Sequence, residues 1–305
     1  MGEAIITRRG GGILKIAGQT EEIVRFGEAI NKYDPVCLKF AGTKLPNPLI
    51  IPTGAGYGVA FDPTGTYLAV THNVWPYITI YKRSGDTFSK LSNPSTLPAN
   101  VVYGVAFDPT GTYLAVAHID SPYITIYKRS GDTFTKLPNP SILPANMANG
   151  VAFDPTGTYL AVVHYESPYI TIYKRSGDTF TKLPNPSILP TNVGYGVAFD
   201  PTGAYLAVAH YVSPCITIYK RNGDTFTKLP NPSTLPPNTG SGVAFDPTGT
   251  YLAVSHSGAP YITIYLATAC FKTNSISDVS IGIKAGYAKE SGFEGAYKKI
   301  VVIFR

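Results

Sequence analysis

The stretch GVAFDPTGTYLAV at residues 150–162 decides the fold of this chain, because near-copies of it recur at a fixed interval. The copies begin at Gly58, Gly104, Gly150, Gly196 and Gly242, each 46 residues after the one before. A period of this length predicts stacked supersecondary units, none of which can bury its apolar surface alone. We therefore expect a repeat protein of five units.

A full unit contains four segments with the character of short strands. In the third copy, residues 151–153 and 159–163 are apolar runs separated by Asp154-Pro155-Thr156-Gly157, which suits a type I turn. Residues 169–173 are rich in β-branched and aromatic side chains, and residues 180–183 are more polar. Two buried inner strands, a mixed third and a polar outer strand form the radial pattern of a β-propeller blade.

The block VAFDPTGTYLAV followed by ITIY resembles the repeat of WD40-type and lactonase-type propellers. The usual form of that repeat is VAFSPDG, then LA, then a strand that ends in an aromatic residue. The resemblance covers residues 43–265 and implies an all-β propeller. It implies no single activity, because propellers host many functions.

Counting the strands predicts a ring of five blades. Five copies of the first three strands are present, but the fourth strand follows only four of them, at residues 88–91, 134–137, 180–183 and 226–229. The missing strand lies near the N-terminus, where the sequence TKLPNP at residues 43–48 matches residues 135–140. We therefore expect this segment to add the outer strand of the last blade and to close the ring.

Composition fits an all-β protein and argues against several functions. The chain has 22 Tyr, 30 Gly and 26 Pro, which favour short strands and turns. The net charge of +6 comes mostly from one Lys-Arg pair per unit, and no basic run is long enough to follow a phosphate backbone, so we expect no nucleic-acid partner. No apolar stretch approaches the ~18 residues of a membrane span. The three cysteines form no CxxC pair and are read as free thiols.

Loops at the two ends of the predicted propeller differ in how much the copies vary. The turn between the first and second strands reads DPTG in every copy, and the loop between the third and fourth reads KRSGDT or KRNGDT. Because strands alternate in direction, these loops share one end, which we call the invariant end. The loops after the second strand and before the first form the variable end. This end is either a binding face or a set of exposed loops that drift freely.

The candidate ligand-binding residues lie at or near the variable end, where aromatic and short polar side chains supply contacts. They are Tyr57, His72, Trp75, Tyr103, His118, Asp120, Asn149, His164, Tyr165, Glu166, Tyr195, His210, Tyr211 and His256. We expect no catalytic residue, no metal and no cofactor, because no Ser-His-Asp set, phosphate loop or pair of carboxylates stands out.

All five histidines occupy one position of the repeat, the end of the second strand. A metal ring is one interpretation, but second strands lie about 4.8 Å further out than the innermost ones. Neighbouring copies are then too far apart to share a zinc ion, whose ligands lie at about 2 Å. A structural hydrogen bond within each blade, for example to the loop before the first strand, is the favoured interpretation. A polar ring for a sugar or a protein partner is the alternative.

Residues 1–42 and 266–305 match no blade, and both join the propeller at its invariant end. We expect them to fold together as a small β base domain into which the propeller, residues 43–265, is inserted. Their segments GEAI at 27–30, DPVCL at 34–38 and IGI at 281–283 resemble small β domains of phage decoration and tail-associated proteins. The opening MGEAIITRRGGG is similar to the start of prophage structural proteins and lacks the apolar region of a signal peptide.

These observations and resemblances predict a non-enzymatic phage or prophage structural protein, made in the bacterial cytoplasm and located in the virion. The base would bind capsid or tail proteins, and the propeller would bind a glycan or protein of the host surface. A carbohydrate-binding module similar to five-bladed lectins is the alternative. A lactonase-like enzyme is less favoured, because such propellers use non-equivalent acids around a central metal, and near-identical copies provide no such cluster.

Overall fold

The structure, a computed structural model, describes residues 3–7, 13–17 and 44–267, and the chain divides into two compact units, Met1–Pro46 and Asn47–Arg305. In the first unit, strands β1 (Glu3–Thr7) and β2 (Ile13–Ala17) pair antiparallel, with Glu3 opposite Ala17. Most of the predicted base domain, including nearly all of residues 266–305, lies outside the described residues. No helix among the described residues is long and apolar enough to cross a membrane.

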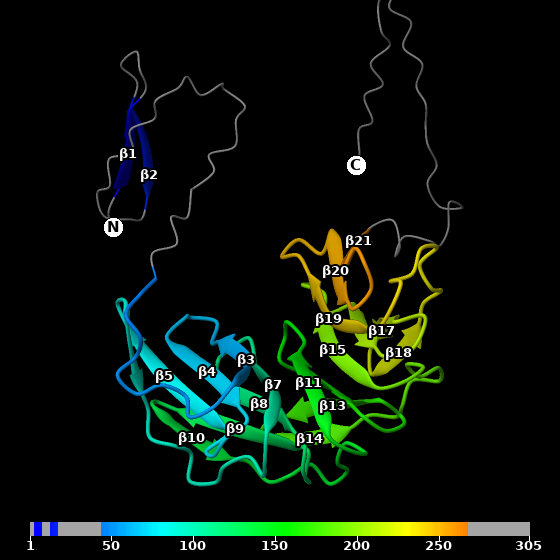
Figure 1. The fold of residues 1–305 in the computed structure, drawn as a ribbon, viewed down its shortest axis with the longest axis horizontal. Coiled ribbons are helices and arrows are strands. Elements are labelled where there is room, and N and C mark those ends of the chain that lie inside the picture. Colours follow the sequence, from blue (N-terminus) through cyan, green and yellow to red (C-terminus); the bar gives the residue numbers. More distant parts are fainter. Residues whose placement is uncertain (1–2, 8–12, 18–43, 268–305) are drawn as a thin grey trace, which may run out of the picture. The chain divides into compact units, whose positions relative to one another are not determined.

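The second unit contains five antiparallel sheets, one for each repeat (Figure 1). The first two sheets are β3 (Gly56–Phe61), β4 (Tyr67–His72), β5 (Ile78–Ser84) and β6 (Thr87–Lys90), then β7 (Val102–Phe107), β8 (Tyr113–His118), β9 (Ile124–Ser130) and β10 (Thr133–Lys136). The third and fourth are β11 (Ala148–Phe153), β12 (Tyr159–His164), β13 (Ile170–Ser176) and β14 (Thr179–Lys182), then β15 (Gly194–Phe199), β16 (Tyr205–His210), β17 (Ile216–Asn222) and β18 (Thr225–Lys228). The fifth has three strands, β19 (Gly240–Phe245), β20 (Tyr251–His256) and β21 (Ile262–Leu266).

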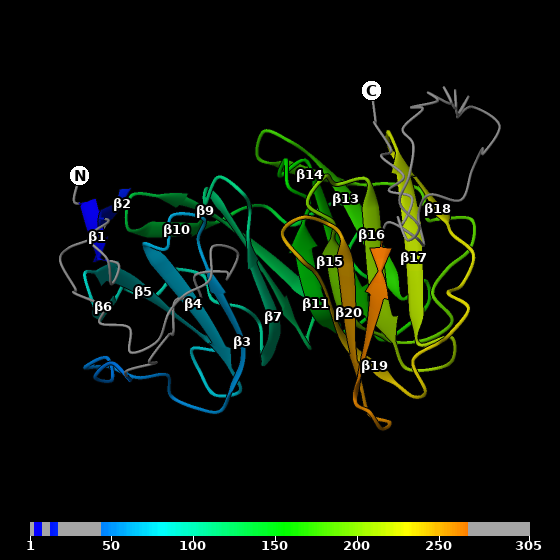
Figure 2. The ribbon, with the colours of Figure 1, turned by 90° about the horizontal axis from the view of Figure 1, so that it is seen from above.

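The sheets stand side by side around a common axis, as Figures 1 and 2 show. Within each sheet the strands pair in chain order, and their innermost strands are in contact in the order β3, β7, β11, β15, β19. The predicted all-β, five-bladed propeller with 46-residue repeats is therefore confirmed.

The turn between the first two strands forms as its sequence predicts. In the third sheet, the amide of Gly157 donates to the Asp154 carbonyl at 2.9 Å, and Gly157 has a left-handed φ of +68° that glycine adopts readily. The Asp154 carboxylate accepts from the Tyr159 amide at 2.8 Å and from the Thr156 hydroxyl at 2.6 Å. These hydrogen bonds pair the polar backbone groups of the turn. The same four residues, Asp-Pro-Thr-Gly, therefore form this turn in every unit.

Burial differs from the sequence expectation in the innermost strands. Every residue of β8 and β12 is buried, as expected for second strands. The innermost β7 has one buried residue followed by five that are half-buried, although its sequence is an apolar run. An innermost strand is the edge of its sheet, so one of its sides has no further strand to cover it. The first four residues of the third strands β9 and β13 are also buried.

The repeated glycine of GVAF marks a close approach between neighbouring blades. A Cβ atom on Gly150 would lie 2.9 Å from the Tyr195 carbonyl oxygen, and one on Gly196 would lie 2.8 Å from Cα of Gly242. Real Cβ contacts are not this short, so a larger residue would push adjacent inner strands apart. Packing therefore accounts for the glycine at this position.

The strand predicted to close the ring is not seen in the described part of the chain. Residues 44–48 lie outside any strand, and the fifth sheet keeps three strands. No inner-strand contact like the others joins β19 to β3. Consequently Ile264 on β21 is 62% exposed, whereas the equivalent Ile172 is 3% exposed.

Candidate functional site

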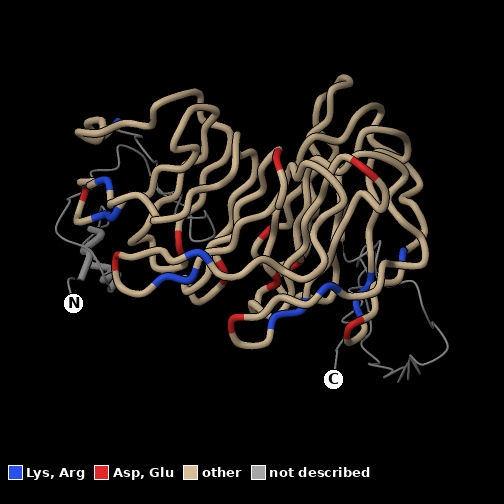
Figure 3. Tube along the Cα trace, turned by 90° about the horizontal axis from the view of Figure 1, so that it is seen from below, with Lys and Arg blue, Asp and Glu red and all other residues tan. Residues whose placement is uncertain are grey.

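The invariant end carries most of the charge of the described chain. Its lysine, arginine and aspartate residues lie along one edge of the array, as Figure 3 shows. They belong to the two-residue hairpin turns between third and fourth strands, such as Gly177-Asp178, and to the strand ends beside them. Some of these charges make contacts between neighbouring sheets.

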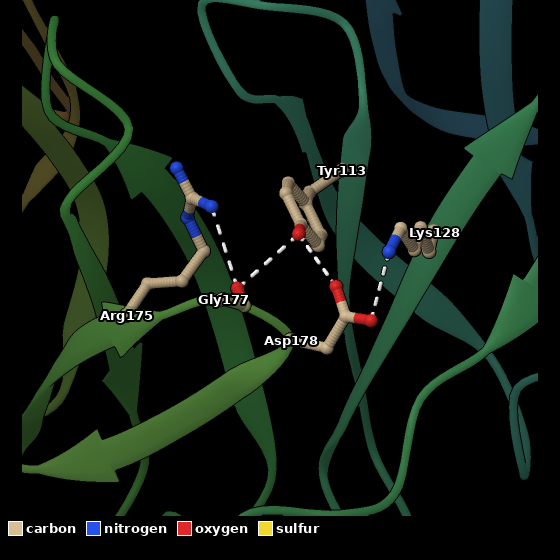
Figure 4. A network of polar contacts seen from close by, with 5 residues as sticks. All are labelled: Tyr113, Lys128, Arg175, Gly177 and Asp178. Atoms are coloured by element: carbon tan, nitrogen blue, oxygen red, sulfur yellow. Dashed lines mark hydrogen bonds and ion pairs between the residues drawn. The ribbon is translucent and has the colours of Figure 1, made fainter.

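In three of the four charged hairpins the aspartate bridges two sheets, and Figure 4 shows the bridge made by Asp178. The Tyr113 hydroxyl of the second sheet donates to Asp178 Oδ1 of the third at 2.6 Å, and Lys128 Nζ lies 2.8 Å from Asp178 Oδ2. The Arg175 guanidinium lies 4.5 Å from the centre of the Tyr113 ring. Hydrogen bonds from Lys128 and Tyr113 lower the pKa of Asp178, and burial together with Asp178 raises the pKa of Tyr113.

The same bridge joins two other pairs of sheets. Its tyrosine–aspartate bonds are Tyr67 to Asp132 and Tyr159 to Asp224, each at 2.6 Å. Because these charged residues hold neighbouring sheets together, the invariant end has a structural role. This role accounts for the small sequence variation among the copies of its loops.

The five histidines are buried at the ends of the second strands. His118 is fully buried, its Nε2 lies 3.0 Å from the Thr125 hydroxyl, and its Nδ1 lies 2.8 Å from the Asp120 carbonyl oxygen. Because a carbonyl only accepts, Nδ1 carries the proton and Nε2 accepts from the threonine. Burial lowers the pKa of His118, His164 and His210 to about 4 each. The structural interpretation agrees with this geometry, although the bonds run to the third strand and the loop after the second.

Sequence reasoning did not single out the threonine partners of the histidines. They are Thr79, Thr125, Thr171, Thr217 and Thr263. Each lies seven residues after its histidine, so the constant His–Thr spacing in all five units was the available signal. Seven residues span the tight loop between adjacent antiparallel strands, which brings the two side chains together.

At the variable end, three tyrosines of the third and fourth units gather. The start of β15 lies beside the end of β16, because Gly194 is opposite His210. The rings of Tyr195 and Tyr211 are 6.4 Å apart and edge-to-face. The pKa of Tyr195 is raised by burial, then by the nearby Tyr211 and Tyr165. We call Tyr165, Tyr195 and Tyr211 the tyrosine cluster; Tyr165 and Tyr211 are about half exposed, at 50% and 52%.

A second aromatic pair lies at the start of the first two inner strands. The rings of Tyr57 and Tyr103 are 5.2 Å apart and tilted by 54°. Trp75 is 63% exposed, and its carbonyl accepts from the Thr53 hydroxyl at 2.7 Å. These residues come from the first two units, whereas the tyrosine cluster comes from the third and fourth.

The polar candidates at the variable end serve the loops or neighbouring units. Asn149 donates from Nδ2 to the Gly194 carbonyl at 2.8 Å, which joins the third and fourth units beside the tyrosine cluster. Asp120 accepts from Asn100 Nδ2 at 2.8 Å. Glu166 is exposed.

The described residues contain no group of three His, Cys, Asp or Glu side chains arranged to hold a metal ion. Cys215 is a buried free thiol whose pKa is raised by burial. It occupies the place of the tyrosine at the start of the third strand in the other units. Cys37 and Cys270 lie outside the described residues.

Comparison with solved structures places the fold among propellers at low sequence identity. A functionally unknown protein from Desulfotomaculum acetoxidans DSM 771 matches with a TM-score of 0.59 and 15% identity over 71% of this chain and 67% of that one. A putative 6-phosphogluconolactonase from Bacteroides uniformis ATCC 8492 matches with a TM-score of 0.55 and 16% identity, over 68% of this chain and 65% of that one. A second putative 6-phosphogluconolactonase, from Bacteroides fragilis NCTC 9343, matches with a TM-score of 0.53 and 15% identity, over 70% of this chain and 66% of that one. The match thus spans about two thirds of these proteins.

No protein-family model matches the chain, and no curated protein matches it. The structural matches therefore relate the chain to lactonase-like propellers in fold alone.

Proposed function

We propose that the protein is a non-enzymatic binding module that presents the variable end of its propeller to a ligand. The tyrosine cluster carries this proposal. Tyrosines offer large, rigid contact surfaces with a polar hydroxyl at low cost in side-chain entropy, which is why binding surfaces use them heavily. At the opposite end, Asp132, Asp178 and Asp224 are engaged in contacts between sheets. At the variable end, Tyr165 and Tyr211 are about half exposed and available to a ligand.

The ligand class that fits the cluster best is a carbohydrate. Half-exposed phenol rings can pack against the apolar face of a sugar while their hydroxyl groups bond its own hydroxyls. Exposed Glu166 and the amide of Asn149 add polar groups at the same end. The match with structures described as lactonases does not extend to an enzyme proposal, since the likeness concerns the fold.

A glycan array probed with the full chain tests this function. Binding to a defined set of glycans is expected, with Tyr165→Ala and Tyr211→Ala each reducing the signal at least tenfold. The matched control is Thr179→Ala, an exposed side chain at the invariant end, which should bind like the parent. A blank array, or equal losses from all three variants, contradicts the proposal.

For the biological setting, we propose a phage or prophage particle that carries the module through its base. The supporting observations are the resemblances of residues 27–38 and 281–283 to small β domains of phage decoration and tail-associated proteins. Mass spectrometry of purified particles tests this setting. Detection of the protein in the particle is expected, and consistent absence from it overturns the proposal.

We further propose that residues 43–45 complete the fifth sheet as its outer strand and so close the propeller. In the second to fourth sheets, the tyrosine that ends the third-strand ITIY run donates to the linker before its sheet, for example Tyr173 to the Ile142 carbonyl at 2.9 Å. In the first sheet, Tyr81 donates in the same way to Ile50 at 2.9 Å. Residues 47–52 therefore occupy the place of a linker that leaves an outer strand, and the strand before it has the sequence Thr43-Lys44-Leu45.

A disulfide between cysteines placed at Leu45 and Ile264 tests this closing strand. Leu137 and Leu183 each donate from the backbone to a third-strand isoleucine carbonyl, Ile126 and Ile172, at 2.8 Å. The same register would place Leu45 opposite Ile264. In a chain without other cysteines, rapid oxidation within one chain is expected. Failure to oxidise, or oxidation between chains, contradicts the closing strand.

A further inference from the structure

The chain contains two asparagine residues that are directly followed by glycine, Asn149 and Asn222. This dipeptide favours deamidation, because glycine has no side chain to hinder its own backbone nitrogen as that nitrogen attacks the side-chain amide carbon of the asparagine. The sequence does not distinguish the two sites. Their surroundings in the structure do, and these surroundings favour reaction at Asn222 alone.

Asn222 lies where the reaction has room. It is the last residue of β17 and lies opposite Thr225, the first residue of β18, so Gly223 and Asp224 form the two-residue turn between these strands. Asn222, Gly223 and Asp224 are all exposed. A Cβ atom on Gly223 would have no heavy atom of the described chain within 4 Å, its adjacent residues apart. The Gly223 nitrogen therefore lies at an open hairpin tip, where the backbone rearranges at low cost.

Asn149 has the opposite surroundings. It is half-buried in β11, and its Nδ2 donates to the Gly194 carbonyl at 2.8 Å. Gly150 lies opposite Val163 of β12, and a Cβ atom on Gly150 would lie 2.9 Å from the Tyr195 carbonyl oxygen. Attack on the Asn149 side chain would break the bond to Gly194 and move Gly150 inside a close contact between two sheets. Local opening must therefore come first.

The other three charged hairpins lack the reactive group. The residue equivalent to Asn222 is serine in each of them, at Ser84, Ser130 and Ser176. A serine hydroxyl offers no carbonyl carbon to a backbone nitrogen, so these hairpins cannot undergo the reaction. The repeat itself therefore supplies serine as the matched control residue for position 222.

We propose that Asn222 is a site of spontaneous deamidation, and that its isoaspartate product releases the bridge between the third and fourth sheets. The Gly223 nitrogen loses its proton to solvent base and bonds to Cγ of Asn222. The Cγ–Nδ2 bond breaks, and Nδ2 takes a proton from solvent and leaves as ammonia. Water then opens the resulting succinimide ring. Cleavage of the bond from nitrogen to Cγ gives aspartate, and cleavage of the bond from nitrogen to the main-chain carbonyl carbon gives isoaspartate.

The reacting bond adjoins the groups that hold these two sheets together. The Tyr159 hydroxyl of the third sheet donates to Asp224 Oδ1 at 2.6 Å and lies 3.2 Å from the Gly223 carbonyl oxygen. Lys174 Nζ lies 2.8 Å from Asp224 Oδ2. Isoaspartate routes the backbone through Cβ and Cγ of residue 222, which adds one carbon atom between β17 and its turn. Because loop length sets the geometry of a tight hairpin, the added atom moves Gly223 and Asp224 away from Tyr159 and Lys174.

Peptide mapping of the folded full chain tests the site. The chain is kept in mildly alkaline buffer, and mass spectrometry follows the two amides and separates aspartate from isoaspartate. We expect the amide of Asn222 to be lost at least about tenfold faster than that of Asn149, because reaction at Asn149 waits for local opening. In urea, where both sites are unfolded, the two rates should become similar. Equal rates in the folded chain, or an Asn222 amide that persists while the chain in urea loses it, overturn the site.

Urea denaturation of fresh and aged chains measures the effect on the bridge. The urea midpoint of the aged parent should fall in proportion to its isoaspartate content, whereas aged Asn222→Ser should keep the midpoint of the fresh variant. Asn222→Asp carries the new charge without the extra backbone atom, so its midpoint should stay close to that of the fresh parent. An unchanged midpoint in a parent that contains isoaspartate at residue 222 contradicts the release of the bridge.

A variant without the bridge separates its release from a general weakening of the hairpin. Tyr159→Phe removes the hydroxyl that bonds Asp224, so ageing should lower the midpoint of this variant less than that of the parent. Tyr113→Phe removes the equivalent hydroxyl between the second and third sheets and is the control, which should show the full ageing effect. Equal ageing shifts in the parent and in Tyr159→Phe overturn the role of the bridge.

Discussion

Nε2 of His118 lies 3.0 Å from Oγ1 of Thr125 on the neighbouring strand, and both side chains are buried. The pair recurs in every unit at distances of 2.9–3.0 Å. A buried imidazole without its donor would keep an unsatisfied nitrogen, which costs more than the bond itself contributes. The row of pairs therefore ties second strands to third strands throughout the propeller.

Removing this hydroxyl should destabilise the fold. We expect Thr125→Val to lower the free energy of unfolding by about 1–3 kcal/mol, because valine keeps the shape and leaves His118 Nε2 without a donor. Urea denaturation followed by circular dichroism measures the change. The matched control is Thr135→Val on the exposed face of β10, where little change is expected. Equal effects at the two positions would contradict the role of the bond.

Acid should destabilise the propeller in a defined pH window. Burial lowers the pKa of His118, His164 and His210 to about 4, whereas an unfolded histidine titrates near 6.5. Between these values the unfolded chain binds more protons than the folded one, so stability present above pH ~6.5 is lost as the pH falls toward ~4. Urea midpoints at a series of pH values measure this.

The carboxylates affect stability at lower pH than the histidines do, so the two effects can be distinguished. Hydrogen bonds from Thr248 and Tyr251 hold the pKa of Asp246 below its ordinary value, and hydrogen bonds from Lys128 and Tyr113 do the same for the pKa of Asp178. The contribution of these carboxylates to stability is lost as the pH falls through their pKa values in the folded state. Stability that stayed constant from pH 7 to pH 4.5 would contradict the assignment to the histidines.

The glycine at the close approach should not tolerate a methyl group. We expect Gly150→Ala to cost about 1–3 kcal/mol, because the new Cβ would meet the Tyr195 carbonyl at 2.9 Å. Gly56→Ala is the control, since its Cβ would have ordinary contacts at 3.8 Å and 3.9 Å. Thermal unfolding of both variants compares them. A Gly150→Ala variant as stable as the control would show that the inner strands can move apart at no cost.

The bridge at the invariant end should couple its two sheets. We expect Tyr113→Phe and Asp178→Asn each to destabilise the protein, and the double variant to cost less than the sum of the two single variants. The expected coupling is small because Lys128 and Asp178 are 44% and 45% exposed, and solvent screens the ion pair. A double-mutant cycle by urea denaturation measures the coupling. Strict additivity would assign the contact no energy.

Much of the fold follows from local sequence. The DPTG turn is specified within four residues, and the strands of each unit pair with their neighbours in chain order. The number of sheets follows from the number of copies. The sequence predicts only part of the candidate site. It places Tyr165, Tyr195 and Tyr211 at the variable end, but not that Tyr165 of one unit lies near Tyr195 and Tyr211 of the next. Their adjacency depends on how units pack, which no single repeat encodes.

The sequence by itself determined five units, four of them with a fourth strand segment, together with their order and the end at which they vary, because these properties are carried by a 46-residue period and by short-range turn chemistry. Only the tertiary structure decided that the histidines are buried, that Asp178 binds residues of the preceding unit, and that Ile264 is exposed whereas Ile172 is buried. These outcomes depend on contacts between units that are alike in sequence but differ in whether a neighbour stands beside them. Each repeat carries the same interface residues, so the burial of a given residue depends on whether a neighbouring sheet packs against it.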